Sequence, residues 1–281
     1  MPSVLYKERG RIAHIILNRP DRLNAINDDM PPEIERAVQR ADGNPNVHVM
    51  ILEGAGKAFC AGYDLSEYGE KNSTSKVVQD MPWDPIQDYQ FMWRNTQHFM
   101  ALWRAMKPVI CKVHGFAVAG GSDIALCADM TIMAEDAEIG YMPTRVWGTP
   151  TTAMWVQRLG PERAKRMLFT GDKISGIEAE SMGLILKSVP KDKLTEEVEL
   201  LAQRMASVPI NQLAMQKMLV NQAMETSGLM QTQKMATLFD GISRHSPEGI
   251  AFKQRVEMVG WKQAVEERDN GSFDWTKNQP I

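Results

Sequence analysis

The chain has 281 residues, 43% of them hydrophobic, with 32 Lys and Arg against 35 Asp and Glu and a formal net charge of −3. This length is ample for one large domain or two unequal ones with a sizeable core. The charge balance offers no basic face for nucleic acid or an anionic membrane, and every apolar run is far shorter than the roughly 20 residues of a membrane span. The first residues lack the apolar region of a secretory signal. We therefore expect a soluble, cytoplasmic protein that binds neither nucleic acid nor membranes.

Cysteine and histidine usage favours neither a disulfide framework nor a metal site. The sequence has an odd number of cysteines, which lie among apolar neighbours and lack CxxC spacing: Cys60, Cys111 and Cys127. The five histidines are scattered, and the sequence has no HExxH motif or His/Cys cluster. We expect buried, reduced thiols and no protein-held metal.

The predicted elements begin with a hairpin of β-branched strands, residues 4–8 and 12–18, around a glycine turn. A helix is expected from Asp28 or Asp29 up to the Asn44-Pro45-Asn46 stop. Strands alternate with helices at about 30-residue intervals, which predicts crossover units of the α/β class. The further elements expected in this half are strands over 47–52, 109–113 and 130–133 and helices over 85–106 and 124–127.

The pattern changes after Pro190. Between residues 194 and 265 only helical windows occur, so we expect an all-helical region at the end of the chain. The polar stretch 66–85 separates two of the earlier elements and is the best candidate for a mobile loop.

Two glycine-rich turns stand out as carriers of chemistry. The segment 54–65 follows an apolar strand, but it lacks the third glycine of a dinucleotide loop and the Ser or Thr of a Walker A loop. Ala61 and Gly62 instead allow a ligand to approach backbone N–H groups, and the segment 114–123 does the same at the start of a helix. Two such donors form an oxyanion hole. The alternative is that both segments are merely tight turns with glycines for packing.

The pair of turns resembles the crotonase (enoyl-CoA hydratase/isomerase) superfamily in motif order and spacing. The resemblance implies a crotonase-type spiral of ββα units over residues 1–200, which carries the acyl-CoA site, and a helical C-terminal oligomerisation region over residues 201–281. The motifs that carry it are Leu17-Asn18-Arg19-Pro20 with Leu23-Asn24-Ala25, Gly56 to Leu65, Gly115 to Gly121, Leu168 to Asp172 and Ala179 to Leu184.

For the reacting end of the substrate, the resemblance implies that an acyl-CoA thioester oxygen accepts hydrogen bonds from the N–H groups of Tyr63 and Gly120. The first of the two family glutamates corresponds to Asp123, whose side chain is one methylene shorter. Asp123 is either the group that transfers a proton or a carboxylate that the positive end of a helix stabilises. The second corresponds to Thr144, which cannot act as a general base. A two-glutamate hydration mechanism is therefore in doubt.

For the remainder of the substrate, the resemblance implies that coenzyme A lies along Arg22, Leu23 and Asn24 and near Ala61. Coenzyme A then enters as part of the substrate, and no tightly bound cofactor is expected. The family forms homotrimers or hexamers in which the C-terminal helices cover a neighbour's active site, which makes Lys253 a contact to the neighbour's coenzyme A.

Other residues near these motifs have two interpretations each. Arg145 is a contact to the acyl chain or forms a salt bridge within its loop, and with Trp147 it suggests a tailored pocket. Ser122 lacks a nucleophile elbow, and His98 is better explained as a helix-surface residue. Enoyl-CoA hydration is our first expectation for the reaction. Double-bond isomerisation, acyl-CoA or β-diketone hydrolysis and non-catalytic acyl-CoA binding stay open.

Overall fold

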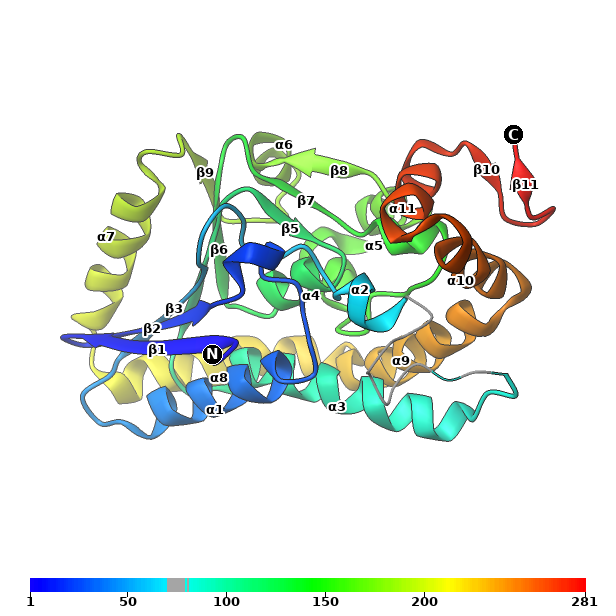
Figure 1. Ribbon diagram of the computed structural model, residues 1–281. Coiled ribbons are helices and arrows are strands. Elements are labelled where there is room, and N and C mark those ends of the chain that lie inside the picture. The colour runs from blue at the N-terminus through cyan, green and yellow to red at the C-terminus, as the bar shows by residue number, and fades with distance from the viewer. Residues whose placement is uncertain (70–78, 80) are drawn as a thin grey trace.

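In the computed structural model, which describes residues 1–69, 79 and 81–281, a six-stranded sheet forms the centre of the molecule. Its strand order is β1-β2-β3-β4-β6-β9, and a second sheet has the order β5-β7-β8. The β1–β2 pair is an antiparallel hairpin, and the other pairs of the large sheet are parallel. The expected α/β class is confirmed (Figure 1).

The elements have the following bounds. The strands are β1 (Val4–Arg9), β2 (Ile12–Leu17), β3 (Val49–Gly54), β4 (Val109–Val113), β5 (Phe116–Val118), β6 (Met130–Ala134), β7 (Glu138–Gly140), β8 (Lys173–Ser175), β9 (Lys187–Val189), β10 (Phe273–Asp274) and β11 (Gln279–Pro280). The α-helices are α1 (Met30–Gly43), α2 (Leu65–Tyr68), α3 (Pro85–Arg104), α4 (Gly120–Leu126), α5 (Met154–Thr170), α6 (Gly176–Ser181), α7 (Leu194–Ala206), α8 (Ile210–Thr226), α9 (Leu229–His245), α10 (Pro247–Val259) and α11 (Trp261–Asn270), and the 3₁₀ helices are η1 (Pro20–Arg22) and η2 (Met142–Arg145).

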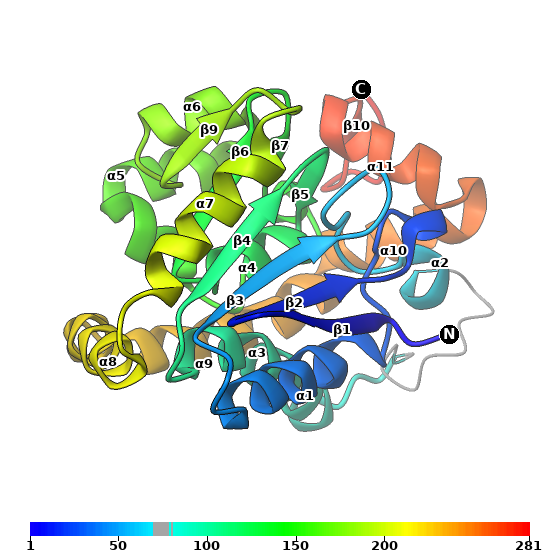
Figure 2. The same ribbon diagram turned by 90° about the vertical axis from the view of Figure 1, so that its left-hand side faces the viewer.

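The central strands read as continuous apolar runs because both faces of the sheet are covered. Helix α7 packs on β3, β4 and β6, and α1 packs on β1, β2 and α3. Figure 2 shows α7 crossing in front of the sheet and α4 behind it. The sheet therefore holds the loops that follow its strands in fixed positions, and the two glycine-rich turns are among these loops.

Several expected boundaries need correction. The strand expected over 47–52 begins at Val49, because the Val47 N–H turns back to the Asn44 carbonyl (3.0 Å). The helix expected over 85–106 ends at Arg104, and the one expected from 124 begins at Gly120. In the stretch 66–85, residues 66–68 belong to α2, while residues 70–78 and 80 lie outside the described part of the chain.

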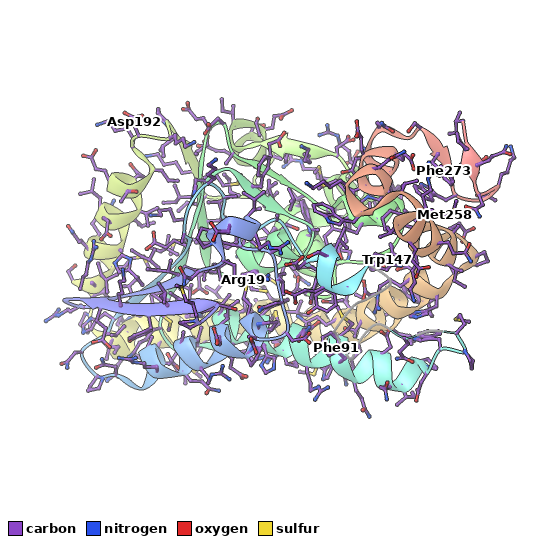
Figure 3. The ribbon with its side chains drawn as sticks, viewed as in Figure 1. Arg19, Phe91, Trp147, Asp192, Met258 and Phe273 are labelled. Carbon is purple, nitrogen blue, oxygen red and sulfur yellow. The ribbon has the colours of Figure 1, made fainter. Side chains whose placement is uncertain are left out.

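The C-terminal region is helical from α7 to α11, as expected, and ends in a two-residue pairing of β10 with β11. Residue 200, where we expected the core to end, falls inside α7. The three cysteines are free and buried, which confirms that expectation. None of the helices in the described residues is long and apolar enough to cross a membrane. Trp147 lies toward the end of the molecule that carries α10 and α11, and Phe91 comes from α3 below it (Figure 3).

Candidate active site

The first glycine-rich turn leaves the backbone N–H of Tyr63 without a hydrogen-bond acceptor among the described residues. The Ile26 N–H donates to the Gly62 carbonyl (2.8 Å), and the Asp64 N–H donates to the Ile26 carbonyl (3.0 Å). This parallel bridge uses the groups on either side of Tyr63 and turns the Tyr63 N–H away from Ile26. Among the described residues, that N–H has no acceptor.

The second turn does the same for Gly120. Ala119 has φ +52°, and its N–H donates to the Gly140 carbonyl (2.9 Å). Helix α4 starts at the next residue, so the Gly120 N–H is the first of the helix and has no intrahelical acceptor. Within the described chain it has no other acceptor either. The positive end of α4 therefore carries a free donor.

The two turns pack directly against each other. A Cβ on Gly62, whose φ is +89°, would lie 2.8 Å from the Ala119 Cβ and 3.4 Å from the Gly120 nitrogen. A Cβ on Gly120 would lie 3.0 Å from the Tyr63 ring. Glycine is required at both positions for this approach. The two free N–H groups thus belong to turns in van der Waals contact.

A cavity of about 1090 Å³ opens beside these turns. Most of the residues predicted for the site line it, and Trp147, one of the two residues suggested for a tailored pocket, lines it too. The predicted residues on its wall are Arg22, Leu23, Ala61, Tyr63, Gly120, Asp123 and Lys253.

Asn24 and Thr144 do not line this cavity. The buried Asn24 amide donates to the carbonyls of Ala55 and Ala58 (both 2.8 Å), so it holds the first turn together. The Thr144 hydroxyl donates to the Leu168 carbonyl (2.5 Å) and is thereby tied to α5. Neither side chain is placed to touch a substrate.

The Asp123 carboxyl is buried in the cavity wall, with only 3% of the residue exposed. The Thr152 hydroxyl donates to its Oδ1 (2.5 Å). Burial raises the pKa of Asp123 from 3.8 to about 7, and the nearby negative charge of Asp240 adds to this rise. A carboxyl with such a pKa both accepts and releases a proton near neutral pH.

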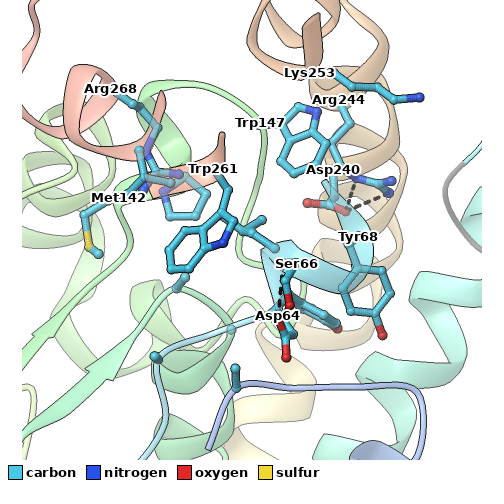
Figure 4. Close-up of a pocket in the computed structure, with 18 of the residues that line it drawn as sticks. Asp64, Ser66, Tyr68, Met142, Trp147, Asp240, Arg244, Lys253, Trp261 and Arg268 are labelled. Atoms are coloured by element: carbon cyan, nitrogen blue, oxygen red, sulfur yellow. Dashed lines mark hydrogen bonds and ion pairs between the residues drawn. The ribbon is translucent and has the colours of Figure 1, made fainter. Parts of the chain in front are cut away.

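Sequence reasoning missed an ion-pair network in the same cavity. Arg244 on α9 contacts Asp88 on α3 (2.8 and 2.9 Å) and Asp240 one turn earlier on α9 (3.1 and 3.2 Å). Asp240 and Arg244 line the cavity, and Figure 4 shows them joined near Trp147. Burial raises the pKa of Asp240. In the sequence, the i,i+4 spacing of Asp240 and Arg244 is the same as that of an ordinary solvated pair.

Two tyrosines complete this part of the wall. Tyr141 and Tyr63 both line the cavity, and the Tyr63 hydroxyl accepts a hydrogen bond from the Asn95 amide (3.4 Å). Burial raises the pKa of the Tyr141 phenol, and the charges of Asp123 and Asp240 raise it further. Both phenols therefore stay protonated and are available as donors.

Three other candidates have structural roles. Arg145 pairs with Asp172 (3.4 Å) and donates to the Thr170 carbonyl (2.7 Å), which agrees with a salt bridge within its region and not with a contact to the acyl chain. His98 pairs with Glu35 (2.6 Å) across α3 and α1. The Ser122 hydroxyl is bound to the Ala119 carbonyl (2.7 Å) inside α4.

The C-terminal helices cover the cavity of their own chain. Lys253 on α10 and Trp261, Lys262 and Arg268 on α11 all line it. Gly260, with φ +84°, lets the chain turn sharply between the two helices, and the fully buried Phe252 anchors them against Trp147 (ring centroids 5.3 Å apart). Lys253 thus lines the cavity of the chain that carries it, and the expectation that it reaches a neighbour's coenzyme A stays a prediction (Figure 4).

Comparison with known proteins agrees with this architecture. The chain matches the family described as enoyl-CoA hydratase/isomerase over residues 7–263. It is 30% identical to crotonyl-CoA hydratase of Syntrophomonas wolfei, across 80% of this chain and 83% of that protein. It is 32% identical to mitochondrial enoyl-CoA hydratase of Pongo abelii, across 79% and 74%.

Solved structures extend the agreement to the C-terminal region. The crystal structure of an enoyl-CoA hydratase from Mycobacterium smegmatis matches with a TM-score of 0.90 and 44% identity, and the match covers 96% of this chain and 94% of that one. The fold is that of the crotonase superfamily. The chain belongs to the enoyl-CoA hydratase/isomerase family.

Proposed function

We propose that this protein is an enoyl-CoA hydratase-type enzyme that adds water to the double bond of an enoyl-CoA thioester. One observation carries the proposal: the turns that hold the free N–H groups of Tyr63 and Gly120 pack together on the wall of the cavity that also contains the buried carboxyl of Asp123. A thioester enolate needs two such donors at its oxygen and a proton-transfer group at its carbons.

In the proposed mechanism the thioester oxygen accepts hydrogen bonds from the Tyr63 and Gly120 N–H groups. Negative charge develops on this oxygen as the enolate forms, and each donor contributes about 3–4 kcal/mol of transition-state stabilisation. Asp123 supplies the proton that the α-carbon takes up. Its pKa of about 7 keeps a large fraction protonated at neutral pH.

Cationic side chains at the cavity fit the phosphates of coenzyme A. Arg22 comes from η1, and Lys253 and Lys262 come from the covering helices; all three line the cavity. In this proposal coenzyme A is bound only as part of the thioester, and no other cofactor takes part.

Double-bond isomerisation is the second candidate. The observation that favours it is the position of Thr144, whose hydroxyl is tied to Leu168 and which replaces the second family glutamate. Isomerisation needs only one base to carry a proton between two carbons, and Asp123 meets that need.

Steady-state assays with a 2-enoyl-CoA and a 3-enoyl-CoA distinguish these candidates. Hydration predicts turnover of crotonyl-CoA that Asp123→Ala lowers by at least about 100-fold and Asp123→Glu partly retains. Turnover of the 3-enoyl-CoA alone would establish the isomerase. Tight binding of both thioesters without any turnover would leave a non-catalytic acyl-CoA-binding protein.

We also propose a homotrimer or a dimer of trimers. The support is an exposed apolar surface on α8 and α9, which a lone chain would leave in water. Light scattering coupled to gel filtration should give three or six chains, and Leu219→Glu should shift the protein to monomers. The large exposed residues of this surface are Met215, Met218, Leu219, Val220, Met235, Leu238, Phe239 and Ile242.

A further inference from the structure

We propose that Asp240 is the second catalytic carboxylate of the site and is the base that deprotonates the attacking water. The inference rests on the proposed hydratase function and adds to it the group that the Thr144 position lacks. The structure places this carboxylate on α9, in a different part of the chain from the turn where family resemblance locates a second glutamate.

The position of Asp240 suits this role. Its side chain lines the same cavity as Asp123, although only 4% of the residue is exposed. The Thr149 N–H donates to its Oδ1 (3.0 Å), and Arg244 holds its Oδ2. A Cβ on Gly148 would lie 3.6 Å from Oδ1 and 3.3 Å from the Tyr141 hydroxyl, so both oxygens border the same small space. A side chain at Gly148 would crowd this space, because its Cβ would also lie 2.8 Å from the Pro143 Cβ.

The charges around the two carboxylates differ, and this difference assigns their roles. Asp240 has a guanidinium and a backbone N–H as partners, both of which favour its ionised form. Asp123 has the hydroxyl and the backbone N–H of Thr152, both neutral, and no cation within ion-pair distance among the described residues, so the guanidinium is what sets Asp240 apart. Two acids held in opposite protonation states are the usual arrangement for paired acid–base work. Asp240 is therefore the base, and Asp123 is the acid.

The resulting step balances in atoms and charge. Asp240 takes one proton from water as the water oxygen bonds to the β-carbon, and the π electrons of the double bond move toward the thioester oxygen. Asp123 gives its proton to the α-carbon as the thioester carbonyl re-forms. The product is the 3-hydroxyacyl thioester, and one proton then returns from Asp240 to Asp123 before the next turnover.

Asp88 makes Asp240 a better base than a simple ion pair would. It binds the same Arg244 nitrogen through both carboxylate oxygens, so one guanidinium is shared between two carboxylates. The groups that face Asp240 are Asp88 from α3, Asp123 from α4, Arg244 from its own helix and the phenols of Tyr63 and Tyr141. Only Arg244 is cationic. Three carboxyl groups and one guanidinium leave an excess of negative charge, which favours keeping a proton within the cluster.

The competing explanation is that Asp240, Arg244 and Asp88 only fasten α9 to α3. Crotonyl-CoA hydration by Asp240→Asn separates the two explanations, with Asp129→Asn as the matched control. Asp129 is a buried carboxylate that accepts a backbone N–H from Val109 (2.7 Å) and pairs with Lys217 (2.8 Å), and it lies away from the cavity. We expect Asp240→Asn to lower kcat by about 100-fold or more with KM within threefold, and Asp129→Asn to keep kcat while lowering Tm.

A loss of less than tenfold in the folded Asp240→Asn enzyme would overturn the proposal. If that variant does not fold, the pH profile of the wild type decides. Two groups in opposite protonation states give a bell-shaped kcat/KM, and its acidic limb moves to lower pH in Asp88→Asn, where Asp240 loses a negative neighbour. A profile with one ionisation would refute the second carboxylate. Absence of any wild-type hydration would instead refute the proposed function itself.

Discussion

Replacing Asp123 with asparagine should stabilise the protein at neutral and alkaline pH while removing its activity. The carboxyl is buried, and its pKa rises from 3.8 to about 7 on folding. The folded protein therefore keeps this proton to a higher pH than the unfolded chain, and stability falls as pH rises between these two values. At about 1.36 kcal/mol for each pH unit, the full loss amounts to about 4 kcal/mol. Asparagine does not ionise and escapes it.

Urea unfolding of wild type and Asp123→Asn at several values between pH 5 and pH 8 tests this reasoning. The Thr152 hydroxyl still has an oxygen to bind in the variant, so the two proteins should differ by only about 1 kcal/mol at pH 5. By pH 8 the difference should have moved by about 3 kcal/mol in favour of the variant. A difference that stays constant within about 1 kcal/mol across this range would refute the inference that Asp123 is protonated in the folded protein. Crotonyl-CoA turnover, measured in parallel, should fall by about 100-fold or more.

Three further variants test other parts of the site. Gly62→Ala should cost about 1–3 kcal/mol of stability and most of the activity, because its Cβ would lie 2.8 Å from that of Ala119; a fully active, stable variant would contradict this packing. Thr144→Val should keep kcat within about twofold and lower the free energy of unfolding by about 1 kcal/mol, because its hydroxyl binds only the Leu168 carbonyl. Arg22→Ala should raise KM for crotonyl-CoA about tenfold, equivalent to about 1.4 kcal/mol. It should leave KM unchanged for a pantetheine thioester, which lacks the nucleotide. Equal effects on both substrates would place Arg22 away from the nucleotide.

The parts of the site that could be predicted from the sequence are those made by local backbone geometry. The Gly62 and Gly120 turns each combine a strand end with residues that carry little or no side chain, and this pattern is visible in a short window. Their pairing needed the family resemblance, because no local signal says that two turns so far apart in the chain meet. The raised pKa of Asp123 could not be predicted from a local pattern either, because it depends on burial that only the assembled fold creates.

The Asp240 carboxylate could not be predicted, for a physical reason. A helical window shows that Asp240 and Arg244 share a face, but not that this face meets Asp88 on α3 or opens onto the cavity. That α10 and α11 line the cavity of their own chain was not predicted either, for a related reason. Whether α10 and α11 cover their own cavity depends on the turn at Gly260 and on the packing of Phe252 against Trp147. Both are set by tertiary contacts.

Because α10 and α11 close over the cavity of the chain that carries them, one polypeptide supplies both proposed catalytic carboxylates and the helices that cover them. Catalysis and assembly are then separable properties. Activity per chain should stay constant on dilution through the range in which the proposed trimer or hexamer dissociates. A mixed assembly of active and Asp123→Ala chains should retain activity in proportion to the number of active chains. Mutations on α8 should therefore be able to change the number of subunits without loss of activity.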